Sequence, residues 1–265
     1  MEFGVVVSSS WNVKDITKCA KAADEAELDF LLVTDHYMTP VSNESIDAWT
    51  VLAALATQTE RIRLGTCVTP IPFRPPQMLA KIIATVDQLS DGRAILGVGA
   101  GWHQPEFDAY SKWEEDKVRV AKTREGIDLI TQLWTSNEPL DFKGAFYQVK
   151  GAILEPKPVQ KPHPPVWFGT RGSYMLRLAQ RYADGWVPGV PGAPPEVYEM
   201  VLAKLRKPGL RKIKLNFNGT LNELRQTIPK FVDLGFDGAI LARESPQDMP
   251  QAMKELATEI IPNYR

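Results

Sequence analysis

The sequence predicts a closed α/β barrel of eight parallel strands, each followed by a helix. Short apolar, β-branched runs alternate with amphipathic helical patterns about eight times along the 265 residues. This length is typical of one such barrel, and hydrophobic and charged fractions of 44% and 24% are ordinary for a globular protein. The chain has no internal repeat beyond the strand–helix unit and no low-complexity tail. We therefore expect one TIM-barrel domain spanning residues 1–265.

Each apolar run is expected to be a strand, and each amphipathic segment is expected to be a helix. The expected strands are Phe3–Val7, Phe30–Thr34, Ile62–Val68, Ala94–Val98, Val166–Gly169, Gly185–Val187, Lys212–Phe217 and Gly238–Leu241. The helices expected after them, in the same order, are Asp15–Glu27, Ala48–Thr59, Pro75–Leu89, Asp116–Trp134, Tyr174–Tyr182, Pro195–Lys204, Asn222–Leu234 and Gln247–Ile261. Apolar side chains recur at helical spacing in these segments.

The alternation is interrupted between the fourth and fifth strands. Residues 136–165 are rich in proline and glycine, and Asp141–Val149 alternates in polarity. This pattern predicts an insertion with a small hairpin that turns near Lys143 and Gly144. We expect it on the side of the barrel where a substrate enters.

Composition limits the partners. A net charge of −1 gives no reason to expect nucleic acid or a membrane surface, and no apolar run approaches a membrane span. Two cysteines, Cys19 and Cys67, form no disulfide framework, and the first residues do not resemble a secretory signal, so we expect a cytoplasmic protein. No metal-binding motif is present. The expected partner is a small molecule.

Polar, aromatic and glycine residues follow the expected strands, where the active site of a barrel lies. These segments are Ser8–Trp11, Thr34–Tyr37, Gly65–Pro70, Gly97–His103, Gly169–Ser173 and Gly185–Gly189. Tryptophan and histidine beside glycine-rich backbone indicate a flat aromatic ligand.

Individual residues at these strand ends allow more than one interpretation. Of the three histidines, His36 and His103 follow strands, where either a catalytic or a structural role is open. Glycines and a helix start at Gly169–Ser173 favour a phosphate site, with Arg171 adding charge. Alternatively, Ser173 simply caps that helix. Cys67 is better explained as a small buried residue than as a nucleophile.

Several sequence blocks carry a family resemblance. They are Thr34–Tyr37, W-T-V-L-A-A-L-A-T-Q-T-E-R-I-R-L-G-T-C-V from Trp49, R-P-P-Q-M-L-A-K-I-I-A-T-V-D-Q-L-S-D-G-R from Arg74, L-G-V-G-A-G-W ending at Trp102, Glu106–Phe107 and Ala183–Trp186. Over about residues 1–190 the chain resembles the bacterial luciferase-like superfamily of flavin and deazaflavin oxidoreductases. Residues 190–265 fit more loosely and look shortened.

The resemblance implies a cofactor in the barrel mouth. Asp35 and His36 resemble the active-site segment of the branch that uses coenzyme F420, a deazaflavin, to transfer hydride. The alternatives are a monooxygenase that uses reduced flavin mononucleotide (FMN) and oxygen, and a barrel that binds such a molecule without turnover. Trp102 stands where a sugar-phosphate-oxidising relative has an acidic residue, and Asp47 where many members have glutamate.

The resemblance also implies site residues. His36 is expected to be the acid or base, with Trp102 and Glu106 as further catalytic candidates, Trp186 as a pocket wall and His103 as a secondary polar group. The residues expected to bind cofactor are Asp35, His36, Thr66, Cys67, Val68, Gly99, Ala100, Gly101, Gly169, Thr170, Arg171, Gly172 and Ser173. Because successive strand residues face opposite sides, Asp35 is also open to facing the helices.

Two structural features are implied as well. A non-proline cis peptide or bulge is expected at Cys67–Val68. A homodimer is expected through the second and third helices. Its candidate contacts are Trp49, Leu52, Met78 and Ile82, which fit packing against the barrel equally well.

Overall fold

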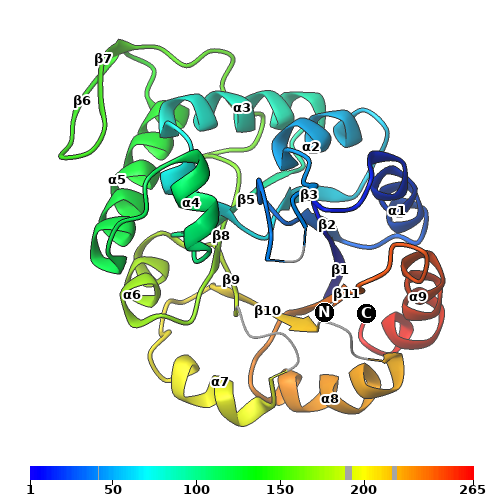
Figure 1. Ribbon diagram of the computed structural model, residues 1–265. Coiled ribbons are helices and arrows are strands. Elements are labelled where there is room, and N and C mark those ends of the chain that lie inside the picture. Colours follow the sequence, from blue (N-terminus) through cyan, green and yellow to red (C-terminus); the bar gives the residue numbers. More distant parts are fainter. Residues whose placement is uncertain (41, 189–192, 217–219) are drawn as a thin grey trace.

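The computed structural model describes residues 1–40, 42–188, 193–216 and 220–265. In these residues eight parallel strands close into a barrel surrounded by helices (Figure 1). The barrel strands are β1 (Glu2–Val7), β2 (Phe30–Val33), β3 (Arg63–Thr66), β5 (Ala94–Gly99), β8 (Val166–Gly169), β9 (Gly185–Val187), β10 (Arg211–Asn216) and β11 (Gly238–Ala242). Their order is β3–β2–β1–β11–β10–β9–β8–β5, and pairing of β3 with β5 closes the circle. The predicted fold class is confirmed.

The helices between the strands also match their predicted positions. They are α1 (Val13–Glu25), α2 (Ala48–Ala56), α3 (Pro76–Leu89), α5 (Asp116–Thr135), α6 (Ser173–Tyr182), α7 (Pro195–Leu202), α8 (Leu221–Asp233) and α9 (Met249–Glu255). Side chains of Asn12, Asp47 and Thr220 cap α1, α2 and α8 by accepting hydrogen bonds from first-turn amides. The last predicted helix is shorter than expected, because a π-helical turn, η2 (Leu256–Ile260), and a 3-10 turn, η3 (Ile261–Asn263), follow α9.

Two features near the barrel mouth differ from the prediction. The predicted strand Ile62–Val68 is broken after β3, and a short strand β4 (Thr69–Pro70) and a 3-10 turn η1 (Ile71–Phe73) follow. An additional short helix, α4 (Gln104–Tyr110), lies between β5 and α5. The predicted ends at Gly189 and Phe217 lie outside the described residues.

The barrel interior is packed, and its amino-terminal end is closed. The inner core consists of Val6, Phe30, Leu32, Ile95, Trp167, Val187, Ile213, Ile240 and Ala242. Below it, the Arg63 guanidinium lies 5.8 Å from the Phe30 ring centroid and 5.7 Å from that of Trp167. Glu2 accepts hydrogen bonds from Arg63 at 2.7 Å and from Arg211 at 2.5 Å. A ligand can therefore approach the interior only from the carboxyl ends of the strands.

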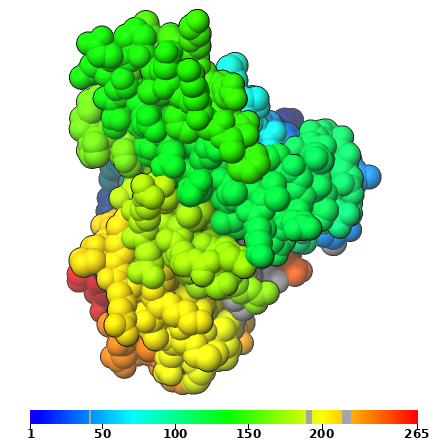
Figure 2. Space-filling view, turned by 90° about the vertical axis from the view of Figure 1, so that its left-hand side faces the viewer, coloured from blue at the N-terminus to red at the C-terminus, as the bar shows by residue number. Residues whose placement is uncertain are grey.

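The insertion contains the predicted hairpin, but its expected position at the substrate entrance is wrong. Strands β6 (Leu140–Lys143) and β7 (Gln148–Ala152) pair antiparallel and project from the flank beside α5 (Figures 1 and 2). The buried Glu125 carboxylate of α5 accepts hydrogen bonds from three turn amides, those of Ala145, Phe146 and Tyr147. The insertion connects the end of a helix to the start of a strand, and both lie at the amino-terminal side of the barrel. It therefore runs along the outside, away from the mouth.

Candidate active site

A histidine–carboxylate pair lies at the mouth of the barrel. His36 follows β2, and its Nδ1 lies 2.9 Å from Oε2 of Glu106 on α4. The Glu106 side chain is 1% exposed and the His36 side chain 17% exposed. The other oxygen, Oε1, accepts hydrogen bonds from the backbone N–H of Tyr37 at 2.5 Å and of Met38 at 3.4 Å. One buried carboxylate thus fixes both the imidazole and the chain that follows it.

This pairing defines what the imidazole can do. With Nδ1–H donating to an ionised carboxylate, the second ring nitrogen, Nε2, is the proton acceptor. A pair of this kind can serve as a general acid or base.

A turn at Gly101 brings α4, and with it Glu106, close to His36. Gly101 has a φ of +83°, and a Cβ there would lie 2.2 Å from the Phe107 ring. Only glycine readily adopts this conformation. The chain can therefore turn from β5 directly into α4. Because α4 is short and begins beside a proline, sequence periodicity did not reveal it.

Aromatic side chains surround the histidine. The Trp102 and His36 ring centroids lie 5.7 Å apart at 80°, and Trp102 is 63% exposed. His103 follows directly, with its ring 5.2 Å from that of Trp102. The ring centroids of Tyr37 and Tyr110 lie 4.9 Å apart, and Tyr110 is also exposed. The structure therefore brings the three candidate catalytic residues, His36, Trp102 and Glu106, together among aromatic side chains.

Asp35 faces away from His36, toward the helices. Its two carboxylate oxygens accept hydrogen bonds from Arg74 at 2.7 and 2.8 Å, and the side chain is 2% exposed. Arg74 also donates to Asp47, the N-cap of α2, at 2.7 Å. Burial alone would lower the pKa of Arg74, but the carboxylates raise it above its usual value. Burial likewise opposes ionisation of Asp47, but hydrogen bonds from Arg74 and Thr50 hold its pKa below the usual value.

The predicted cis peptide is present between Cys67 and Val68. Val68 extends over the ends of two neighbouring strands. A Cβ at Gly99 or at Gly169 would lie 2.6 Å from a Val68 methyl group, so both positions must lack a side chain. Burial raises the pKa of the Cys67 thiol to about 12, which supports its interpretation as a small uncharged residue.

The end of β8 presents backbone rather than side chains. Thr170 is buried, whereas Arg171, Gly172 and Ser173 are exposed. Gly172, rather than the expected Ser173, is the N-cap of α6, and no side chain caps this helix. Among the described residues, nothing other than its own chain neighbours lies within 4 Å of a Cβ built on Gly172. A helix start without a side-chain cap leaves first-turn amides available to bind an anion.

One residue expected near this site, Trp186, lies elsewhere. Trp186 is fully buried, its indole donates to the Thr170 carbonyl at 2.7 Å, and its ring packs against Tyr198 and Phe236. It faces the helices, so its expected role as a pocket wall is wrong. Because β9 has three residues, and Gly185 and Val187 face the interior, the residue between them must face outward.

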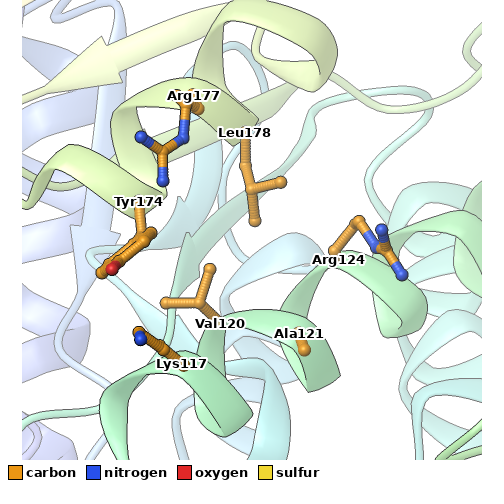
Figure 3. A pocket seen from close by; sticks show the side chains of 7 residues that line it. All are labelled: Lys117, Val120, Ala121, Arg124, Tyr174, Arg177 and Leu178. Carbon is orange, nitrogen blue, oxygen red and sulfur yellow. The ribbon is translucent and has the colours of Figure 1, made fainter.

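A groove with cationic sides begins beside the α6 N-terminus (Figure 3). It has a volume of about 320 Å³ between α5 and α6 and is lined by Lys117, Val120, Ala121, Arg124, Tyr174, Arg177 and Leu178. The Arg177 guanidinium lies 4.7 Å from the Tyr174 ring centroid. In the described part of the chain, Lys117, Arg124 and Arg177 form no ion pair. Their charge makes the potential beside the amide site more positive.

Other kinds of site find no support in the residues described. Within those ranges, no three histidine, cysteine, aspartate or glutamate side chains cluster as metal ligands would. None of the helices there combines the length and apolar character that a membrane crossing requires.

Comparison with known proteins identifies the family of the chain. A family model described as "Luciferase-like monooxygenase" matches residues 1–213. The F420-dependent glucose-6-phosphate dehydrogenase of Amycolatopsis mediterranei (strain U-32) is 37% identical over 179 residues, which are 66% of this chain and 53% of that protein. The FMNH(2)-dependent dimethylsulfone monooxygenase of Pseudomonas putida is 31% identical over 191 residues, 68% of this chain and 51% of that protein. The chain thus spans about half the length of these curated relatives.

A solved structure shows the same fold over the whole chain. An F420-dependent secondary alcohol dehydrogenase in complex with an F420-acetone adduct superposes with a TM-score of 0.83, covering 100% of this chain and 99% of that chain at 20% identity.

Proposed function

Because the chain belongs to the luciferase-like monooxygenase family, we propose that it is an oxidoreductase that transfers a hydride between coenzyme F420 and a small organic substrate at the barrel mouth. The observation that carries the proposal is the pairing of His36 Nδ1 with the buried Glu106 carboxylate at 2.9 Å. A hydride transfer involving an alcohol or carbonyl needs one positioned proton carrier, and this pair provides one. Relatives named F420-dependent glucose-6-phosphate dehydrogenase support the choice of cofactor.

The proposed mechanism assigns the proton to His36. A bound deazaflavin would supply a two-electron hydride carrier. In the oxidative direction, His36 Nε2 accepts the proton of the substrate hydroxyl while the adjacent C–H bond breaks with its electron pair and the C=O bond forms. In the reductive direction, His36 returns that proton to the carbonyl oxygen. Glu106 stabilises the imidazolium, and Trp102 borders the substrate.

We propose that residues on both sides of the mouth would hold the cofactor. The ring would rest on Val68 and contact the backbone from Gly99 to Gly101, with Thr66 and Cys67 beneath. The phosphate would bind the amides of Gly169–Ser173, assisted by Arg171. The unpaired cations of the α5–α6 groove favour the same anionic group. Asp35, already bound by Arg74, contributes through position rather than by contact with the ligand.

An FMN-dependent monooxygenase is the second candidate, because one relative is named as an FMNH(2)-dependent enzyme. Titration of the purified protein with F420 and with FMN, followed by fluorescence, tests the choice directly. We expect tighter binding of F420, and reduction or oxidation of F420 with candidate alcohols and carbonyl compounds. Equal or tighter binding of FMN, with oxygen consumption by reduced flavin, would support the monooxygenase. Binding of either cofactor without turnover over a broad substrate panel would support a non-catalytic binding protein.

We propose a cytoplasmic homodimer with no nucleic-acid or membrane partner. On α3, the apolar side chains of Met78, Ile82 and Leu89 are 59%, 37% and 46% exposed and lie at helical spacing. Trp49 and Leu52 of α2 are buried in the core instead, so they support packing against the barrel rather than a dimer contact. Sedimentation of the wild type and of Met78→Glu tests this dimer. A monomeric wild-type protein would refute it.

A further inference from the structure

We infer that Arg74 is a positioning residue that holds His36 and the Cys67–Val68 segment in one fixed arrangement, an inference that rests on the proposed function. Arg74 lies between η1 and α3, and its side chain is 10% exposed. Its guanidinium makes two hydrogen bonds to Asp35 and one to Asp47, and it lies 5.0 Å from the Tyr37 ring centroid. It therefore contacts the residues immediately before and after His36.

The Arg74–Asp35 ion pair and the Glu106 carboxylate hold the backbone on either side of His36. Asp35, which precedes His36, is fixed by Arg74, and the amides of Tyr37 and Met38, which follow, are fixed by Glu106. The His36 ring cannot shift along the strand axis without breaking a charge-assisted hydrogen bond in a buried site.

The Asp35 carboxylate is also linked by hydrogen bonds to the Cys67–Val68 segment, the proposed support of the cofactor ring. The Thr69 hydroxyl lies 2.7 Å from Asp35 Oδ2 and 3.0 Å from Thr66 Oγ1, and it accepts a hydrogen bond from the Trp49 indole at 2.9 Å. Thr66 and Thr69 bracket the Cys67–Val68 bond, and both are buried. The proton carrier and the proposed ring support thus share the Asp35 anchor, so Arg74 sets their relative position.

A lysine cannot replace this function. The planar guanidinium binds both oxygens of one carboxylate and one oxygen of a second carboxylate at the same time. An ammonium group retains the charge but not this geometry. Arg74→Lys therefore keeps the positive charge that balances Asp35 and Asp47 but removes the geometry that positions His36.

The matched control is Arg63→Lys. Arg63 is also partly buried, ion-paired and stacked on aromatic rings, but it lies at the opposite end of the barrel. We expect Arg74→Lys to lower kcat about 10- to 100-fold, by analogy with the loss when a group that orients a metal ligand is replaced, with a small change in F420 affinity. Arg63→Lys should lower the melting temperature without this loss of kcat.

A second readout does not require turnover. The chain has only three histidines, so 15N-labelled imidazole signals can be assigned by substitution. We expect wild-type His36 to show a single tautomer protonated at Nδ1, and Arg74→Lys to show a mixture of tautomers or a broadened signal. Thr69→Val, nearly isosteric, should give a weaker change of the same kind and provides the test if Arg74→Lys does not fold.

The inference is overturned if folded Arg74→Lys keeps the wild-type kcat and His36 signal, or if Arg63→Lys changes both equally. In the Thr69→Val test, an unchanged His36 signal likewise counts against it. If the wild-type protein turns over no F420 substrate, the proposed function fails, but the imidazole spectra still decide whether Arg74 positions His36.

Discussion

The two sides of the barrel mouth are built in different ways. On one side, at the ends of β2 and β3 and on α4, buried side chains bind one another: Glu106 is 1% exposed and Asp35 2% exposed, and each is held by several hydrogen bonds. On the other side, at the end of β8, the residues from Arg171 to Ser173 are exposed, and the α6 N-terminus has no side-chain cap. The first side fixes geometry, and the second leaves amide donors open to a ligand. We therefore expect changes on the first side to lower the rate and changes on the second to lower cofactor affinity.

The largest effect should come from His36→Ala. Removing the proton carrier should lower kcat by about two to four orders of magnitude, the usual contribution of a positioned acid or base. F420 affinity should change little, because the amides near α6 remain. Stopped-flow hydride transfer and a binding titration measure the two quantities separately. His163→Ala is the control, since His163 bonds the Pro164 carbonyl and packs against Trp134 away from the mouth. Near-normal turnover by folded His36→Ala would move the search to His103.

Glu106→Gln tests whether the buried carboxylate on the His36 side of the mouth sets the tautomer of His36. An amide NH2 facing His36 Nδ1 would favour the tautomer protonated at Nε2, which cannot accept a proton there. We expect kcat to fall about 100-fold, with the loss larger in the oxidative direction because His36 must then act as a base. Steady-state assays in both directions measure it. An equal loss of F420 affinity and no change in kcat would contradict the division between the two sides.

Gly172→Val tests the second side. Space around Gly172 is open, so the fold should tolerate the branched side chain, whereas a phosphate approaching the amides would meet it. We expect the F420 dissociation constant to rise about tenfold, corresponding to the loss of a hydrogen bond to a charged group. At saturating F420, kcat should stay near the wild-type value. Gly172→Ala should give a smaller increase. Unchanged affinity in both folded variants would place the phosphate elsewhere.

The smallest effect concerns acid stability on the first side. The pKa of Asp47 is lowered in the folded protein, so ionised Asp47 stabilises the fold above its unfolded pKa of about 3.9. This contribution is lost as the pH falls through the lower, folded pKa. The melting temperature of Asp47→Asn should therefore lie below that of the wild type near neutral pH, and the difference should narrow below about pH 4. Circular dichroism at a series of pH values measures it. A difference that grows in acid would reverse the sign of the argument.

The strands and most helices were predictable because each carries its own pattern. Runs such as Ala94–Val98 are buried on both faces and read as apolar throughout, and the real strand, β5, differs by one residue. His36 could be found by its position after a strand. Asp35 was expected among the cofactor-binding residues, with an orientation toward the helices left open, and the structure shows it facing the helices and paired with Arg74.

The features that the sequence did not predict correctly depend on contacts between distant residues, on elements too short to show a pattern, or on the direction of a neighbouring helix. Arg74 lies 39 residues from Asp35, and nothing local to either residue indicates the ion pair. Helix α4, with seven residues, is too short to show periodicity. The hairpin was predicted from its alternation, but its location required the direction of the preceding helix, which places it at the amino-terminal side.

The floor formed by Arg63 across Phe30 and Trp167 has a kinetic consequence. Because ligands approach the barrel from the carboxyl ends of the strands, a molecule bound deeper at the mouth must bind first and leave last. If the ring rests on Val68 with the substrate above it, F420 is the leading reactant and the last product to depart. Excess substrate would then hold the spent cofactor in place, and turnover would slow at high substrate concentration.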